Sequence, residues 1–112
     1  MLKLLHTADW HVGKQFGQFD EEVSRKLARD RVSVIERIMG LARQHRVDAV
    51  LCAGDLFDVP NPGEEWWAEV HKVFIESDRA GWSRPVVMLP GNHDPLTRGS
   101  IYSSLHPFRR GL

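Results

Sequence analysis

The feature that most constrains this chain is a set of three short polar motifs, each placed shortly after a run of mostly apolar residues. The motifs are Asp9-x-His11, Gly54-Asp55-x-x-Asp58 and Gly91-Asn92-His93-Asp94. Short apolar runs bounded by turn-forming residues are typical of buried strands. Two long stretches with helical periodicity separate the three runs. The order strand, helix, strand, helix, strand predicts an α/β fold with a parallel sheet and right-handed crossovers.

The predicted elements have specific bounds. We expect strands at residues 2–5, 47–53 and 86–89. A first helix is expected from an N-cap at Asp20 to about His45. A second helix is expected with Asn61 at its N-cap and Pro62 at its first position. The strand 47–53 is nearly all apolar, so we expect it to be covered on both faces. Residues 95–112 are predicted to be mostly loop. The helix positions expected to face the core are Leu27, Val34, Ile35, Ile38, Leu41 and Ala42, then Trp66, Val70, Val73, Phe74 and Ser77.

Composition indicates one folded domain in a reducing compartment. The 112 residues include 42% hydrophobic residues, and 15 Lys+Arg balance 15 Asp+Glu. This neutrality argues against a domain that coats nucleic acid, but not against an enzyme that holds phosphates through metal ions. The single cysteine, Cys52, excludes an internal disulfide and is expected to be a small buried side chain. With no signal peptide and no apolar span, we expect a cytoplasmic protein.

The three motifs should converge, because ligands bind at the carboxyl ends of the strands in parallel α/β sheets. Asp9 and His11 would grip one ion, Asp55 would bridge two ions, and Asn92 would offer a carbonyl oxygen to the second. Mixed oxygen and nitrogen ligands suit Mn²⁺, Fe or Zn²⁺ better than Mg²⁺. Two such ions would activate a water for in-line attack on a phosphate ester.

The remaining residues of the third motif have predicted catalytic roles. His93 is placed to protonate the leaving oxygen or to stabilise charge on the phosphate. Asp94 is expected to orient His93 through its ring N–H. Gly54 and Gly91 would let the backbone turn sharply at the strand ends.

Together these motifs resemble the signature of the calcineurin-like metallophosphoesterases. The local sequences 6–13, 54–58 and 90–95 further resemble the SbcD-like branch of DNA repair nucleases, over roughly residues 1 to 105. The resemblance implies that Asp9, His11, Asp55 and Asn92 bind two metal ions, with Mn²⁺ expected first, and that His93 is catalytic. It also implies DNA ends as substrate, an SbcC-like coiled-coil ATPase as partner, and a possible homodimer of the full-length protein. Asp58 receives no assigned role.

The chain departs from that family in one respect. The family's downstream G-H and G-H-x-H motifs are missing, and the only later histidine is His106. We therefore expect residues 1–112 to form the N-terminal portion of one metallophosphoesterase domain, the β-α-β-α-β half of an αββα sandwich. Such a half should expose one sheet face. Of the two explanations, a fragment of a longer protein and a truncated gene product, we favour the fragment.

Three functions remain in competition. The first is a metal-dependent DNA exonuclease or endonuclease, the second a metallophosphoesterase acting on another ester, and the third an inactive fragment or interaction module. Phosphate-loop and dinucleotide-binding motifs are not found. Basic residues that would contact DNA phosphates, or simply lie on the surface, are Lys14, Arg98, Arg109 and Arg110.

Overall fold

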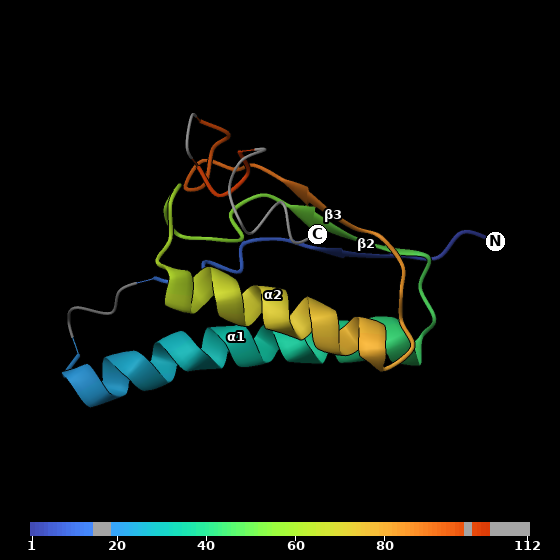
Figure 1. Cartoon of the computed structure of the whole chain (residues 1–112), viewed down its shortest axis with the longest axis horizontal. Helices are drawn as coiled ribbons and strands as arrows, with labels where there is room; N and C mark the ends of the chain where they lie inside the picture. Colours follow the sequence, from blue (N-terminus) through green and yellow to red (C-terminus); the bar gives the residue numbers. More distant parts are fainter. Residues whose placement is uncertain (15–18, 98–99, 104–112) are drawn as a thin grey trace.

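The computed structural model describes residues 1–14, 19–97 and 100–103. Its elements, in order, are β1 (Leu4–Thr7), α1 (Glu21–Gln44), β2 (Ala49–Ala53), α2 (Glu64–Arg79) and β3 (Val86–Leu89). The strands form one parallel sheet in the order β1-β2-β3, so the predicted α/β topology is confirmed (Figure 1). Arg98, His106, Arg109 and Arg110 lie outside the described residues.

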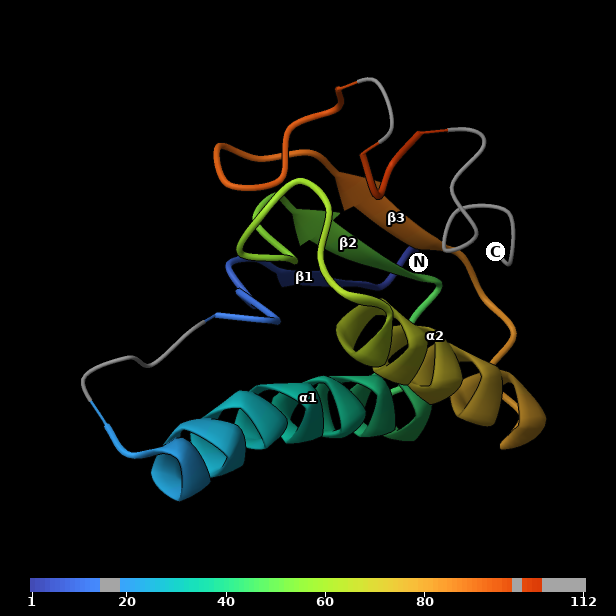
Figure 2. The same cartoon turned by 60° about the vertical axis from the view of Figure 1, so that its left-hand side comes forward.

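Both helices cover the same face of the sheet (Figure 2). Burial therefore alternates along β2, where Val50 and Cys52 are buried and Leu51 is only half-buried. The prediction that strand 47–53 is covered on both faces is wrong for the part of the chain that the structure describes. The expected exposed sheet face is present: the side chains with large exposed fractions are Leu4 (46%), Val87 (44%) and Leu89 (55%).

Helix α1 begins where the sequence predicts. The Asp20 side chain accepts a hydrogen bond from the backbone N–H of Val23 at 2.9 Å, which satisfies one of the free donors of the first turn. The predicted core face is partly wrong, because Val34 and Leu41 are 48% and 47% exposed. The buried residues are Ala28, Val32, Ile35, Met39 and Ala42. Periodicity identifies an apolar stripe, but the packing partner decides which edge of a wide stripe is covered.

Helix α2 begins two residues later than predicted. Gly63, not Asn61, is the N-cap, and its extended backbone (ψ 152°) makes Glu64 the first helical residue. Pro62 thus precedes the helix instead of opening it. The predicted buried face is confirmed for Val70, Val73, Phe74 and Ser77, while Trp66 is partly buried against the core.

Residues of the motif loops form part of the hydrophobic core. Trp10, Val12, Leu56 and Phe57 are all buried. These anchors fix the loops on which the polar motif residues lie. Cys52 is buried as predicted, and burial raises the pKa of its thiol to about 12, so it stays a neutral packing group. Among the helices that the structure describes, none is long and apolar enough to cross a membrane.

Candidate metal centre

The first two motifs pair with each other beyond the ends of their strands. The backbone N–H of Asp9 donates to the Gly54 carbonyl at 3.1 Å, and that of His11 donates to the Asp55 carbonyl at 3.0 Å. A parallel bridge at Val12 continues this pairing. The Asp9-x-His11 segment is therefore held against the Gly54-Asp55 segment by the same type of hydrogen bond that joins β1 to β2.

The predicted ligands have unusual backbone conformations. Asp9, His11 and Asp55 have φ values of 59°, 48° and 54°, in the left-handed region. Over the described ranges 1–14, 19–97 and 100–103, Arg46 is the only other non-glycine residue with positive φ. Such conformations cost about 1–3 kcal/mol each and tend to occur at functional sites. The fold tolerates this cost at three of the four predicted metal ligands.

The side chains of Asp9, His11 and Asp55 are close enough to share an ion. Their candidate ligand atoms all lie within 4.8 Å of one another. His11 Nε2 lies 3.8 Å from Asp9 Oδ1. Two atoms that each bind one ion at about 2.1 Å are at most about 4.2 Å apart, so this pair fits a common divalent ion. The donor set of two carboxylates and one imidazole also has the chemistry of a divalent metal site.

Asp58, which the sequence left without a role, lies between two histidines. Its Oδ1 atom is 3.1 Å from His11 Nδ1 and 3.9 Å from His93 Nδ1. The rings of His11 and His93 meet edge to face, with centroids 5.0 Å apart. One indication of this position was present in the sequence: Asp58 follows Asp55 by three residues, so both lie on one loop.

Asp94 does not take the position predicted for it. It is completely buried, and each of its two carboxylate oxygens accepts two hydrogen bonds from groups other than the His93 ring. A carboxylate has about four acceptor positions, so these bonds use its capacity. The donors are Asp55 N (3.0 Å) and Gly91 N (2.8 Å) to Oδ1, and Phe57 N (3.0 Å) and Tyr102 Oη (2.6 Å) to Oδ2. Asp94 therefore organises the loops, and Tyr102 is a participant that no motif contains.

The third motif lies directly against the second. The backbone N–H of His93 donates to Asp55 Oδ1 at 2.8 Å. A Cβ atom at Gly91 would lie 2.5 Å from the Asp55 amide nitrogen, so only glycine permits this approach. Asn92 is exposed on the same loop, between Gly91 and His93. Its part as a ligand stays a prediction.

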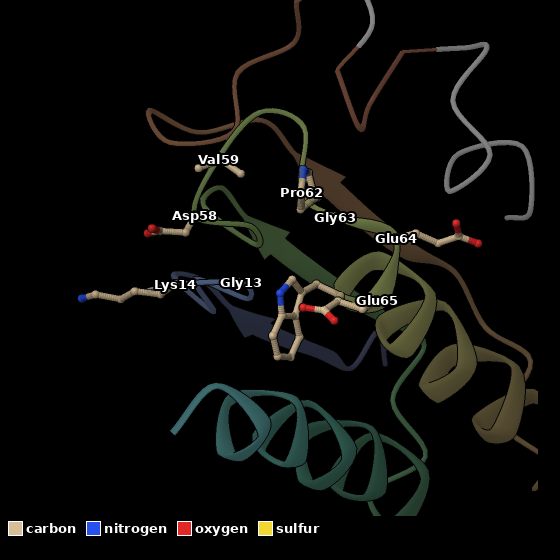
Figure 3. A pocket seen from close by; sticks show the side chains of 9 residues that line it. Gly13, Lys14, Asp58, Val59, Pro62, Gly63, Glu64 and Glu65 are labelled. Carbon is tan, nitrogen blue, oxygen red and sulfur yellow. The ribbon is translucent and has the colours of Figure 1, made fainter. Parts of the chain in front are cut away.

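A cleft of about 710 Å³ adjoins this cluster (Figure 3). Asp58 lines it together with Lys14 and with Trp66 from the first turn of α2. In Figure 3 the side chains of Asp58 and Lys14 extend toward the same side. The cleft therefore meets the cluster at Asp58, and the side chains of Asp9, His11 and Asp55 are not part of its lining.

The sequence model of the family described as calcineurin-like phosphoesterase matches residues 2–111. The chain belongs to this family. Among curated proteins, it is similar to the SbcD component of the nuclease SbcCD from Bacillus subtilis, with 34% identity over 109 residues, covering 93% of this chain and 25% of that protein. The protein of the same name from Rhodobacter capsulatus is 36% identical over 97 residues, covering 87% of this chain and 22% of that protein. The protein of the same name from Escherichia coli K12 is 29% identical over 95 residues, covering 85% of this chain and 22% of that protein.

The predicted family and the predicted half-sandwich fold are therefore confirmed. The family is one of phosphoesterases, and the relatives reported above are named as components of a nuclease. It spans about a quarter of the length of these relatives.

Proposed function

We propose that this chain supplies the first half of a two-metal centre that hydrolyses phosphodiester bonds in DNA, as an exonuclease or endonuclease of DNA repair. The observation that carries the proposal is the gathering of Asp9, His11 and Asp55 ligand atoms within 4.8 Å at the ends of β1 and β2. The similarity to nuclease components supports DNA as the substrate class.

The residues present fit divalent metal ions. Asp9 and His11 would hold one ion, Asp55 would contact both, and Asn92 would contact the second. This mixed donor set favours Mn²⁺, with Fe, Zn²⁺ and Mg²⁺ as alternatives. The chemistry that such ions supply when bound is charge neutralisation on the phosphate and a lowered pKa of a coordinated water.

The histidine of the third motif would handle the proton of the leaving group. The His93 side chain is 54% exposed, so it is accessible to a substrate. Its Nδ1 lies 3.9 Å from Asp58 Oδ1, a separation that a small movement on substrate binding would close to a hydrogen bond. A carboxylate on Nδ1 would orient the ring and leave Nε2 to face the leaving oxygen. His93 would then donate a proton from Nε2 to that oxygen.

We further propose that residues 1–112 are the N-terminal portion of a single metallophosphoesterase domain. The remaining histidine ligands and the second sheet would come from chain outside these residues. Two observations support this proposal. The chain covers about a quarter of its relatives, and Leu4, Val87 and Leu89 lie exposed on the sheet face that a second sheet would cover.

The full-length protein is proposed to work with partners. Its relatives are named as the SbcD component of a nuclease called SbcCD, which supports an SbcC-like coiled-coil ATPase as the partner protein. DNA would be the substrate, the full-length protein is proposed to form a homodimer, and the cytoplasm is the proposed compartment.

A Mn²⁺ titration of the 112-residue chain tests the metal centre directly. An ion that binds only the folded chain stabilises it by about 2.7 kcal/mol at a hundredfold excess over Kd, so Tm should rise. Asp55→Ala should remove most of this rise, whereas Asp30→Ala, on the exposed surface of α1, should keep it. A wild-type chain whose Tm does not change when Mn²⁺ is added would contradict the proposed metal centre.

A second experiment tests the substrate class in the full-length protein. Asp55→Ala should abolish DNA cleavage, because it removes the ligand proposed to contact both ions. The wild-type protein should cleave DNA in preference to a small phosphodiester at equal concentration. Preference for the small ester would contradict DNA as the substrate and would favour a metallophosphoesterase acting on another ester.

A further inference from the structure

The segment after the third motif carries the single tyrosine of the chain. Tyr102 is 8% exposed, and its hydroxyl donates to Asp94 Oδ2 at 2.6 Å. Asp94, which is completely buried, holds the backbones of the second and third motifs at the same time. One carboxylate therefore connects Tyr102 to both motif loops.

We propose that Tyr102 is a positioning residue for the metal centre, acting through Asp94 to fix the backbone at Asp55 and Gly91. This inference deepens the proposed function and rests on it, because Asp55 is the ligand proposed to contact both ions. Tyr102 itself contacts neither substrate nor metal in this scheme.

The connection from Tyr102 to the metal centre runs through hydrogen bonds of ordinary length. Asp94 Oδ1 accepts from Asp55 N at 3.0 Å and from Gly91 N at 2.8 Å. Asp55 Oδ1 in turn accepts from the backbone N–H of His93 at 2.8 Å. Asp55 has the unfavourable φ of 54°, so it stays in place only while its surroundings hold it. Asp94 supplies part of that constraint, because it accepts the hydrogen bond from the backbone N–H of Asp55.

The hydroxyl of Tyr102 matters because Asp94 has no access to water. A buried carboxylate is costly unless hydrogen bonds satisfy its oxygens. Of the four donors to Asp94 named above, three are backbone N–H groups, and the fourth is the Tyr102 hydroxyl. Burial, followed by the hydrogen bond to Asp94, raises the pKa of Tyr102, so the hydroxyl keeps its proton at neutral pH.

Tyr102 is held in place by contacts that do not involve Asp94. The backbone N–H of its neighbour Ile101 donates to the Pro60 carbonyl at 2.9 Å, and the Ile101 side chain is completely buried. Ser100 is also buried, and its Oγ accepts from the Thr97 N–H at 3.2 Å. The segment is thus anchored independently of Asp94, which allows Tyr102 to act as a fixed support for the carboxylate.

Amide hydrogen exchange, measured by NMR on the metal-free chain, tests the positioning role without any metal. Tyr102→Phe removes one hydroxyl and keeps the ring. Exchange at Asp55, Phe57 and Gly91 should become roughly tenfold faster, as expected for loss of one hydrogen bond to a buried charged group. Exchange at Cys52, inside β2, should not change. The matched control Ser77→Ala deletes a buried hydroxyl on α2, outside the motif loops and outside the segment that carries Tyr102, and it should leave all four amides unaffected.

The same variants are then titrated with Mn²⁺. Tyr102→Phe should weaken Mn²⁺ binding roughly tenfold, the lower end of the range for groups that orient metal ligands, and Ser77→Ala should bind Mn²⁺ like the wild type. Unchanged exchange at the three amides, or an equal increase at Cys52, would overturn the inference. A wild-type chain that does not bind Mn²⁺ would overturn the proposed function, whereas equal binding by wild type and Tyr102→Phe would overturn the inference alone.

Discussion

The Oδ1 atom of Asp58 lies 3.1 Å from Nδ1 of His11. This contact leaves Nε2 as the ring nitrogen that faces Asp9, 3.8 Å from its Oδ1 atom. A carboxylate behind a histidine ligand orients the ring and makes its other nitrogen a better electron donor. The geometry thus gives Asp58 a supporting position behind a proposed metal ligand, in addition to its proximity to His93.

Removing this carboxylate should weaken metal binding without unfolding the chain. We expect Asp58→Ala to lower Mn²⁺ affinity roughly 10- to 100-fold, the range for groups that orient ligands. Asp58→Asn keeps an oxygen acceptor and should fall between Asp58→Ala and the wild type. Isothermal titration calorimetry measures the three dissociation constants, with Asp30→Ala as the control. Equal affinity in Asp58→Ala and wild type would show that Asp58 does not support His11.

Two glycines should respond in opposite ways to the same substitution. Gly91→Ala would place a Cβ atom 2.5 Å from the Asp55 amide nitrogen, and the backbone of the loop would have to move. We expect a loss of about 1–3 kcal/mol in the free energy of unfolding. Gly40 lies within α1 with nothing within 4 Å of an added Cβ, so Gly40→Ala should gain about 0.5–1 kcal/mol. Urea unfolding of both variants measures these changes, and a stable Gly91→Ala would contradict the close approach.

Alkaline pH should destabilise the chain through Cys52. Burial raises the pKa of this thiol from 9.0 to about 12, so between these values the unfolded chain loses a proton that the folded chain retains. The free energy of unfolding should therefore fall by about 1.4 kcal/mol per pH unit above pH 9 and be unaffected by this group below it.

The comparison with Cys52→Ala isolates this contribution. The variant lacks the thiol, so the free energy of unfolding from urea titrations should fall less steeply above pH 9 than in the wild type. Tyr102, whose pKa is raised chiefly by burial and by Asp94, adds to the slope of both proteins, so the difference between the slopes reports mainly on Cys52. Identical slopes for the two proteins would mean that the thiol is not protected from ionisation in the folded state.

Much of the fold follows from local sequence patterns. The strand-helix order, the N-cap at Asp20 and the buried face of α2 were all predictable, because each depends on a few neighbouring residues. One error occurred where distant contacts decide, because Val34 is exposed by the way α1 packs. The other was local, because the extended backbone at Gly63 delays the start of α2.

In the candidate site, too, some features were predictable from the sequence and others were not. Its proposed ligands were predictable as a group, because parallel strands bring the residues that follow them to one edge of the sheet. The partners of those residues were not. Asp94 follows His93 directly in the sequence, but it contacts Tyr102, Asp55 of the second motif and Gly91 of its own loop.

The sequence alone determined which elements form, in which order, and which polar residues follow the strands, because these depend on short-range spacing and on the rules of parallel sheets. Only the tertiary structure decided that Asp58 lies behind His11, that Asp94 is a buried organiser of two loops, and that Tyr102 belongs with it. The physical reason is that hydrogen bonds to a buried carboxylate depend on donors brought together by folding. No local pattern encodes donors that lie 39 residues before Asp94 and 8 residues after it.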